Sequence, residues 1–544
     1  MTEAEELALA VEVPTWPDIV FRALPARAED EAIVFPDARH SYGSLAEAIV
    51  RRARSLLALG VQRGDKVGIL MPNCMAYVEL LFATAAIGAV AVVINARYRA
   101  YEFRHVLANA EIKVLLTGGR VTDGPDFVER LQEAFPDLAG GEAIALADLP
   151  SLRRMVVFGE DRPGFLGEAG FDGLAARVPA AEVHQRRLAI GLRDPFLIMY
   201  TSGTTSLPKG CVLSHEAVVR TSQVKTLRFQ LTDADRYWSP LPLFHLGGLN
   251  PLGAILLAGG TFLCAPRFEA REAVSALVAE RATIAFFAFP AIINDVVAEQ
   301  ERAQADMSGI RAIMSSAAVQ PEPVREKLVR LFPNAVQIGT YGMTESAGTI
   351  SSTAVYDRPG AGLERVGRVA PGMEIRILSE DGETAPTGTI GEIAIRGFAL
   401  FEGYYNDPAA TAAAMRDGWL MSGDLGSFNE HEELMFHGRS KDMFKVGGEN
   451  VAAAEIEAFV ATHPAVKMCQ VVAMADARLG EVAAAFVELE AGQNASEEEL
   501  IAHCRGQLSA FKVPRAVRFV SEWPLTASSK VQKAKLSALL AADA

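Results

Sequence analysis

A polar segment, residues 200–210 with the sequence YTSGTTSLPKG, directly follows the apolar run DPFLIMY. A loop rich in Gly, Ser and Thr can turn several backbone N–H groups and hydroxyls toward one point, as polyphosphate oxygens require. Lys209 adds a positive charge. The segment is not a P-loop of the form GxxxxGK[ST], because Pro208 replaces the second Gly and Gly210 replaces the hydroxyl residue. We therefore expect a phosphate-binding loop of another design.

Two further segments carry groups that suit a nucleotide. In GTYGMTE, residues 339–345, an aromatic ring beside Gly suits stacking on adenine, and a hydroxyl beside a carboxylate suits a phosphate and its magnesium ion. Asp424 follows Gly423, and its short carboxylate is suited to accept hydrogen bonds from both hydroxyls of a ribose. Taken alone, each segment is also compatible with an ordinary turn or a solvated side chain.

The elements that must position these segments alternate between helix and strand. Residues 44–60, SLAEAIVRRARSLLALG, have the apolar spacing of a helix, with Ser44 and Glu47 spaced as a capping box and Gly60 placed where the helix would end. Next, DKVGILMP predicts a strand, MAYVELLFATAAIG a helix and AVAVVIN another strand. This alternation indicates a layered α/β domain.

Later parts of the chain have a different sequence pattern. Strands are expected near residues 260–264, 283–289 and 335–339, whereas residues 139–170 are less periodic and are expected to form a surface excursion. Gly and Pro are frequent over residues 359–403, which predicts short strands joined by tight turns.

A small C-terminal domain is predicted from the change of pattern after HGRSKD. A short helix, two strands, a second helix and a third strand then make a compact unit of roughly 100 residues. We place the boundary near Lys441, which gives a large N-terminal domain of residues 1–440 and a small α+β domain of residues 441–544.

Composition narrows the class of protein. The chain has 544 residues, 50% of them hydrophobic, and a formal net charge of −15, which disfavours non-specific binding to nucleic acid or anionic lipid. The five Cys are scattered without metal-ligand spacing, as expected for reduced thiols in the cytoplasm. The N-terminus begins acidic, unlike a secretory signal, and the longest apolar stretch, MAYVELLFATAAIGAVAVVINA, is interpreted as a buried helix and strand rather than a membrane span.

In their order along the chain, these segments resemble the motifs of the adenylate-forming superfamily, which includes acyl-CoA synthetases, adenylation domains of peptide synthetases and firefly luciferase. The resemblance runs from about Tyr42 to Lys530. YTSGTTSLPKG resembles the phosphate loop of that family, YGMTE its adenine and metal motif, and SGD at residues 422–424 its ribose motif. GRSKDMFKVGGENV at residues 438–451 is similar to its hinge and thioester loop, and PLTASSKVQKAKL to the segment that bears its adenylation lysine.

The resemblance implies a large multi-subdomain adenylating domain with a small mobile C-terminal domain, and ATP, Mg²⁺ and CoA as the small molecules bound. Lys530 would bridge the substrate carboxylate and the α-phosphate during adenylation. The other nucleotide-binding residues implied are Thr201, Ser202, Gly203, Thr204, Thr205 and Lys209 on the phosphates, Tyr341 on adenine, Thr344 on the α-phosphate, Glu345 on Mg²⁺, and Asp424 with Arg439 on the ribose.

The same resemblance implies a second half-reaction after rotation about Lys441. A loop that contains Lys445, Gly447 and Gly448 would then approach the pantetheine arm of CoA, which small residues permit. His245 would line the junction of the acyl pocket and the thiol tunnel, although a buried structural histidine is the alternative.

The acyl pocket is expected to be apolar. It would be built from residues 245–250, 285–293, 315–320 and 339–342, with no obvious Lys or Arg to pair with a second carboxylate. Gly342 falls where acetate-specific relatives carry a Trp, so a fatty, aryl or polycyclic acid larger than acetate is expected.

Three functions compete at this stage. The favoured one is an acyl-CoA synthetase that works through an acyl-adenylate. The second is an adenylating ligase that loads a carrier protein, and the third is a nucleotide-binding or luciferase-like protein without ligase activity. We expect a cytoplasmic monomer or homodimer without nucleic-acid or integral-membrane association.

Overall fold

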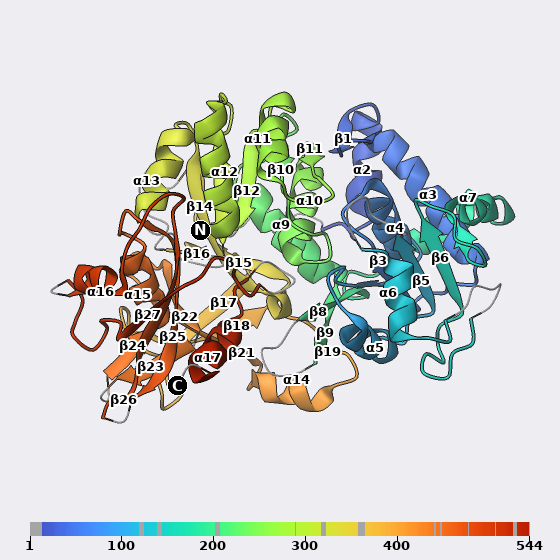
Figure 1. Cartoon of the computed structure of the whole chain (residues 1–544). Coiled ribbons are helices and arrows are strands. Elements are labelled where there is room, and N and C mark those ends of the chain that lie inside the picture. Colours follow the sequence, from blue (N-terminus) through green and yellow to red (C-terminus); the bar gives the residue numbers. More distant parts are fainter. Residues whose placement is uncertain are drawn as a thin grey trace.

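The computed structural model describes most of the 544-residue chain (Figure 1). The described residues are 13–118, 125–138, 144–201, 207–288, 290–316, 322–356, 365–439, 442–446, 449–476, 478–505, 507–525 and 530–542. The strands of these residues form four sheets, and helices cover the two largest. The mixed α/β architecture confirms the predicted fold class.

The first large sheet holds the helix and strand alternation predicted for the N-terminal part. Among the described residues it has eight strands in the order β19-β9-β8-β4-β3-β5-β6-β7. Its strands are β3 (Lys66–Leu70), β4 (Val90–Val93), β5 (Val114–Gly118), β6 (Arg154–Phe158), β7 (Leu166–Gly167), β8 (Pro195–Thr201), β9 (Lys209–Ser214) and β19 (Gly403–Tyr404). The helices of this part are α3 (Tyr42–Ala58), α4 (Met75–Ala86), α5 (Ala100–Asn109), α6 (Phe127–Ala134), α7 (Glu168–Gly173), the 3₁₀ helix η1 (Leu174–Arg177) and α8 (Ala180–Leu188).

Both faces of this sheet are buried. Val67 and Ile69 of β3 belong to the main core with α3 and α4, while Leu70 and Leu115 belong to a second core with α5 and α6. Pairing is parallel from β8 through β7, and β8 with β9 forms an antiparallel hairpin. Helices on both faces of a mostly parallel sheet are the expected packing for such a pattern.

The second large sheet has nine strands among the described residues, in the order β16-β15-β14-β13-β12-β10-β11-β1-β2. Its strands are β1 (Glu31–Val34), β2 (Arg39–Ser41), β10 (Arg236–Trp238), β11 (Thr261–Leu263), β12 (Ile284–Ala288), β13 (Ala312–Ser316), β14 (Val336–Met343), β15 (Gly348–Ser352) and β16 (Arg368–Val369). Its helices are α2 (Asp18–Arg27), α9 (His215–Arg228), α10 (Leu246–Ala258), α11 (Ala270–Ala279), α12 (Pro290–Ala303), α13 (Glu322–Leu331) and the 3₁₀ helix η2 (Thr344–Ser346).

Two smaller sheets follow. The first consists of β17 (Met373–Leu378), β18 (Gly391–Gly397), β20 (Met415–Arg416), β21 (Trp419–Phe428) and β22 (Leu434–Arg439), with α14 (Pro408–Ala414) beside them. The second consists of β23 (Met443–Val446), β24 (Glu449–Ala452), β25 (Val466–Asp476), β26 (Gly480–Leu489) and β27 (Ala516–Phe519), with α15 (Ala453–Val460), α16 (Glu497–Cys504) and α17 (Lys533–Ala542).

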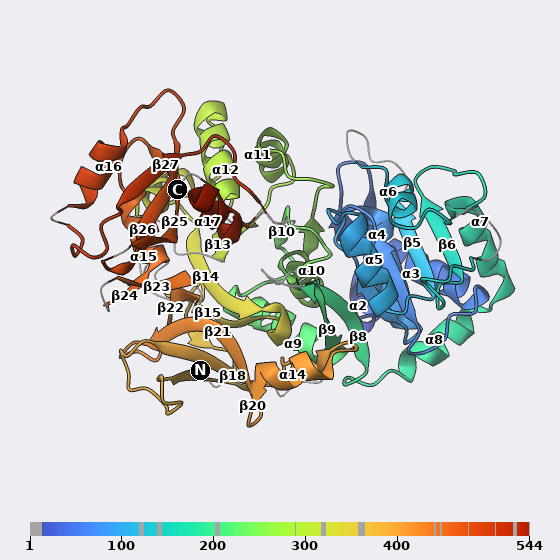
Figure 2. The same ribbon diagram turned by 60° about the horizontal axis from the view of Figure 1, so that its bottom comes forward.

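The last sheet and its helices lie beside α12 in both views (Figures 1 and 2). Across this seam Lys467 Nζ of β25 lies 4.0 Å from Asp295 Oδ1 of α12, and Asn294 Nδ2 donates to the Lys467 carbonyl at 3.2 Å. Lys327 of α13 and Glu490 approach to 3.8 Å.

Two local expectations are wrong. The capping box of α3 is formed by Ser41 and Ser44, not Ser44 and Glu47, because the strand β2 ends at Ser41 and delivers its hydroxyl to the N–H of Ser44. The predicted surface excursion at 139–170 contains β6, whose apolar residues pair with β5 inside the first sheet. Gly60 does follow the end of α3 as predicted, with a positive φ of 83°.

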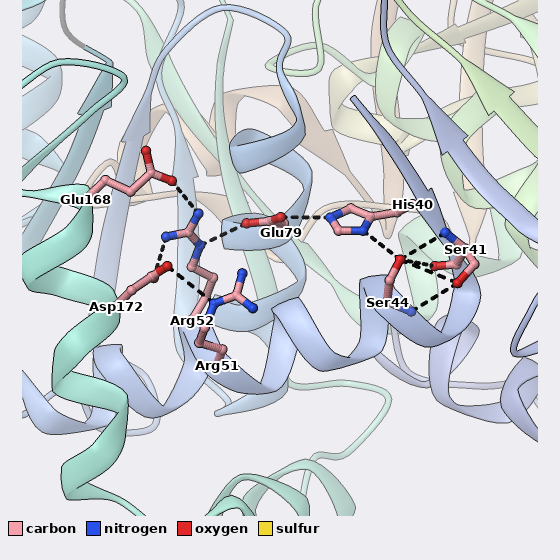
Figure 3. Close-up of polar contacts among 8 residues, drawn as sticks. All are labelled: His40, Ser41, Ser44, Arg51, Arg52, Glu79, Glu168 and Asp172. Carbon is pink, nitrogen blue, oxygen red and sulfur yellow. Dashed lines mark hydrogen bonds and ion pairs between the residues drawn. The ribbon is translucent and has the colours of Figure 1, made fainter. Parts of the chain in front are cut away.

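A buried ion network ties α3 to α4 and α7 (Figure 3). Arg52 of α3 is 4% exposed, and its Nε donates to Glu79 of α4 at 2.8 Å. Glu79 also meets His40 Nε2 at 2.9 Å, and Asp172 of α7 accepts from Arg52. Burial alone would raise the pKa of Glu79, but the hydrogen bonds from His40 and Arg52 outweigh it and hold that pKa below 4.5.

In the described part of the chain, no helix combines the length and the apolar character needed to cross a bilayer. The apolar stretch predicted to be a helix and a strand forms α4 and β4, both inside the core.

Candidate active site

The ends of the predicted phosphate loop are fixed by the β8–β9 hairpin. Thr201 ends β8 and lies opposite Lys209, which begins β9, and Thr201 Oγ1 donates to the Lys209 carbonyl at 3.4 Å. The Lys209 ammonium lies 5.0 Å from the centre of the Tyr404 ring. The remaining loop residues Ser202, Gly203, Thr204 and Thr205 lie outside the described residues.

The predicted metal motif lies at the end of β14. Thr344 and Glu345 form the 3₁₀ helix η2, and Glu345 is 8% exposed. Its Oε1 accepts a hydrogen bond of 2.8 Å from Tyr404 Oη, and its backbone carbonyl accepts one from the N–H of Phe401. Burial, and then the charge of Glu345, raise the pKa of Tyr404, so this phenol is the donor. Because β19 pairs with β9 and carries Tyr404, it links the β8–β9 hairpin to the carboxylate of Glu345.

Tyr341 and Asp424 meet although they come from different sheets. Tyr341 Oη donates to Asp424 Oδ2 at 2.9 Å, and the Tyr341 ring packs 5.7 Å from that of Phe436. Arg439 lies opposite Asp424 in the β21–β22 pairing, with its Nε 3.4 Å from Asp424 Oδ1. Burial raises the pKa of Asp424, while Arg439, Tyr341 and Lys530 lower it in part. The carboxylate therefore sits among donors and beside a cation.

Lys530 of the small C-terminal unit reaches the same region. Its side chain touches solvent, yet crowding by surrounding protein atoms lowers its pKa, as does Arg439, whereas Asp424 raises it. Lys530 and Arg97 also lower the pKa of His245, which burial brings to about 3. The ammonium of Lys530 therefore lies within electrostatic reach of Asp424 and His245.

His245 precedes α10 and is neutral at ordinary pH because of its buried position. Its ring packs 4.8 Å from that of Phe244, and its Nε2 has no hydrogen-bond partner among the described residues. A neutral, partly buried imidazole whose Nε2 is buried without a partner among the described residues can line a ligand channel or receive a polar ligand atom.

The segments predicted to line the acyl pocket gather at one edge of the second sheet. β12, β13 and β14 are parallel, so the strand ends that carry the described residues 285–288, 315–316 and 339–342 lie together. Residues 245–250 belong to the start of α10 and its preceding residue, and residues 289 and 317–320 lie outside the described part. A Cβ atom placed on Gly342 would lie 1.7 Å from the carbonyl oxygen of Gly348, so this position requires Gly.

Several predicted site residues are not described. Lys441, Gly447 and Gly448 lie outside the described residues, and for Lys445 the structure describes its strand, β23, but not its side chain. Among the described residues no cluster of three or more His, Cys, Asp or Glu side chains could hold a metal by itself.

The structure adds a site residue that sequence reasoning missed. Tyr404 bonds Glu345 across 59 positions of sequence. Its local sequence GYYND carries only the signal of a turn, so no spacing rule leads from it to η2.

Comparisons with known proteins agree on one family. The AMP-binding enzyme family matches residues 20–405, and the AMP-binding enzyme C-terminal domain matches residues 455–530. The chain is 33% identical to the putative acyl-CoA synthetase YngI of Bacillus subtilis, covering 93% of each chain. It is 32% identical to the human mitochondrial medium-chain acyl-CoA ligase ACSF2, covering 93% of this chain and 84% of that protein.

Solved structures give the same result. The anthranilate CoA ligase AuaEII in complex with anthranoyl-AMP superposes with a TM-score of 0.87 at 26% identity, covering 98% of this chain and 99% of the other. The Mycobacterium tuberculosis fatty acyl CoA synthetase superposes with a TM-score of 0.71 at 29% identity, covering 97% of this chain and 99% of the other.

Proposed function

This chain belongs to the AMP-binding enzyme family, and from that membership we propose that it is an AMP-forming acid–thiol ligase of the acyl-CoA synthetase type. It activates a carboxylic acid with ATP to give acyl-AMP and pyrophosphate, and then transfers the acyl group to CoA with release of AMP. The observation that carries the proposal is the convergence of Glu345, the Tyr341–Asp424 pair and Lys530 from separate segments on one site.

In the first half-reaction a carboxylate oxygen attacks the α-phosphorus, and the bond to pyrophosphate breaks. Negative charge develops on the phosphoryl oxygens, so the site must supply donors and a cation in fixed positions. Lys530 holds the carboxylate against the α-phosphate, and Thr344 donates to that phosphate. The loop of Thr201, Ser202, Gly203, Thr204 and Thr205, with Lys209, holds the outer phosphates.

The nucleoside is held by the pair that joins two sheets. Asp424 accepts from the ribose hydroxyls, and Arg439 offsets part of the rise in its pKa that burial causes. Tyr341 contacts the adenine while its hydroxyl orients Asp424.

The residues around Glu345 fit a magnesium ion that is held mainly by phosphates. Mg²⁺ typically takes one or two protein carboxylates and fills the rest of its coordination with phosphate oxygens and water. Glu345 supplies one nearly buried carboxylate next to the Thr344 hydroxyl, which matches this donor set. When bound, the ion would neutralise charge on the departing pyrophosphate.

The second half-reaction requires a thiol at the same carbonyl carbon. We place the pivot at Lys441, in the stretch where the chain leaves the sheet of β22 and enters that of β23. Rotation removes Lys530 and brings Lys445, Gly447 and Gly448 toward the pantetheine arm, while His245 lines the passage to the acyl carbon. We assign the arrangement with Lys530 near Asp424 to the adenylation half-reaction.

The proposed acid is larger than acetate, since Gly342 falls where acetate-specific relatives carry a Trp, and no larger side chain fits against Gly348 at this position. Relatives of this chain are named for medium-chain and fatty acids, and one structural neighbour for anthranilate. A fatty, aryl or polycyclic acid therefore remains the proposed class. A cytoplasmic location and a monomer or homodimer are part of the same proposal, checked by fractionation and by sedimentation.

The deciding experiment measures pyrophosphate release with ATP and Mg²⁺ across a panel of carboxylic acids, with and without CoA. We expect multiple turnovers only with CoA, together with an acyl-CoA product. Acyl-AMP that CoA cannot discharge would instead identify a carrier protein as the acceptor. No pyrophosphate release from any acid would refute ligase activity and leave a nucleotide-binding or luciferase-like protein.

A further inference from the structure

A buried lysine on α9 is not used by the proposed mechanism. Lys225 is 3% exposed, and its Nζ donates to Thr349 Oγ1 at 2.8 Å and lies 3.5 Å from Met314 Sδ. The rings of Phe229 and Phe286 lie 5.9 and 5.8 Å from the ammonium. Among the described residues no carboxylate pairs with it, and burial lowers the pKa of Lys225 to about 7.

Such a lysine is energetically costly unless an acceptor joins it. An ammonium has three donors, of which Thr349 satisfies one and the thioether of Met314 only weakly a second. Aromatic faces offset part of the desolvation. The contrast is Arg52, which is equally buried but meets Glu79 and two further carboxylates. A buried lysine with unsatisfied donors has the capacity to bind an acceptor that a ligand supplies.

One neighbour of Lys225 belongs to a segment proposed to line the acyl pocket, and two others adjoin such segments. Phe286 lies in β12, and Met314 in β13 precedes Ser315. Thr349 in β15 lies opposite Gly342 of β14. Met314 lies opposite Ile338 of β14, and Ile338 comes six residues before Thr344, which is proposed to bind the α-phosphate. The contact with Met314 therefore puts the Lys225 side chain toward the part of β14 that precedes Thr344, away from the residue assigned to the α-phosphate.

A second polar atom at this end also lacks a partner. Asn250 of α10 is 1% exposed, and its Nδ2 donates to the carbonyl of Ala347 at 3.0 Å. Its Oδ1 has no hydrogen-bond partner among the described residues. Asn250 packs against Gly348, where an added Cβ would lie 2.1 Å from Nδ2. Thr221, one turn before Lys225 on α9, donates to the same Ala347 carbonyl at 2.9 Å, so Asn250 and the helix that carries Lys225 meet at Ala347.

We propose that Lys225 is a specificity-determining residue that binds an oxygen acceptor at the end of the acid remote from its reacting carboxylate. A second carboxylate, a ketone or a hydroxyl oxygen would serve, with an apolar body between the two ends. This inference rests on the proposed function and narrows its substrate class, because the pocket was expected to be apolar throughout. The sequence analysis did not assign Lys225 to the pocket, because α9 comes before every segment from which the pocket was expected to be built.

The test compares acids of equal length that differ only at the remote end: a plain alkyl acid, its ω-hydroxy acid and its ω-carboxy acid. The readout is kcat/KM for pyrophosphate release with CoA present. A hydrogen bond to a buried charged group corresponds to roughly 10- to 100-fold, so we expect at least one oxygenated acid to exceed the plain acid by that factor. The difference between the hydroxy and carboxy acids identifies the acceptor.

Lys225→Met retains most of the side-chain volume without the charge, and we expect it to erase or invert this preference, mainly through KM. Lys113→Met is the matched control, because Lys113 pairs with Asp65 far from the pocket, and it should leave the preference unchanged.

The inference would be overturned if wild-type kcat/KM for the oxygenated acids were close to that for the plain acid. It would also be overturned if Lys225→Met kept a preference for an oxygenated acid. In both cases the proposed ligase activity would stand. If Lys225→Met does not fold, the wild-type ratio decides. If no acid of either kind releases pyrophosphate, the proposed function itself fails and this inference fails with it.

Discussion

The hydroxyl of Tyr404 offers a sharp test of the active-site geometry. In Tyr404→Phe the ring remains, so its packing 4.9 Å from Phe401 and the Lys209 ammonium 5.0 Å above it are retained. The loss is the 2.8 Å hydrogen bond to Glu345, a carboxylate that is 8% exposed. A hydrogen bond to a charged group contributes about 1.5–3 kcal/mol, equivalent to roughly 10- to 100-fold in rate or binding.

The assay is single-turnover formation of acyl-AMP as the Mg²⁺ concentration is varied. Without the phenol, Glu345 is held less firmly, so we expect a lower adenylation rate and a higher half-saturating Mg²⁺ concentration. Transfer from preformed acyl-AMP to CoA should change little, because Glu345 is assigned to the first half-reaction alone.

The matched control is the adjacent Tyr405→Phe. Tyr405 Oη also donates to a carboxylate, Glu111 at 2.5 Å, but that pair is exposed, and among the described residues neither side chain hydrogen-bonds a predicted site residue. We expect its adenylation rate to stay within twofold of wild type. Equal behaviour of the two variants, or normal Mg²⁺ dependence in Tyr404→Phe, would show that the contact with Glu345 plays no part in adenylation.

Three further predictions concern the rest of the site and the fold. Lys530→Ala should abolish acyl-AMP formation but leave thioester formation from preformed acyl-AMP largely intact; normal adenylation in a pyrophosphate assay would refute its role. Asp424→Asn should raise KM for ATP by about 10-fold or more through weakened ribose contacts, and an unchanged KM would contradict that assignment. Glu79→Gln should lower the free energy of unfolding by about 3 kcal/mol in urea titrations at pH 7, because Arg52 stays buried with one anion fewer. His40 and Arg52 hold the pKa of Glu79 below 4.5, so this contribution is present above pH 4.5 and is lost as the pH falls through the lower folded-state value; a difference that persists in acid would oppose the reasoning.

Periodicity predicted the first sheet well because its elements are long and regular. α4 and β4 were predicted from one apolar stretch, and the structure places both in the core. The start of α3 was not predicted, because Ser41, Ser44 and Glu47 offer two pairs with capping-box spacing and only the position of β2 decides between them. β6 was missed because a five-residue strand between irregular segments has too little pattern to register.

The candidate site divides in the same way. Tyr341, Glu345 and Asp424 were found from local motifs, and the structure brings Tyr341 and Asp424 into contact across 83 positions. Tyr404 and Lys225 have no local motif, and their partners lie 59 and 124 positions away. Contacts of this kind depend on how strands from distant segments pair, which a single sequence does not encode in any short pattern.

The contacts between α12 and β25 bear on how easily the small C-terminal domain can change its orientation. The described ion pairs of this seam involve partly exposed side chains, from 31% for Lys467 to 49% for Asp295, and pairs of that kind contribute about 0–1 kcal/mol each. The described ion pairs of this seam therefore contribute little to the orientation of the small C-terminal domain. A modest difference in ligand affinity between two orientations is then enough to redistribute the population. In the proposed domain alternation, the ligands bound at the nucleotide and acyl sites, rather than the contacts of the seam, would determine which of the two orientations is populated.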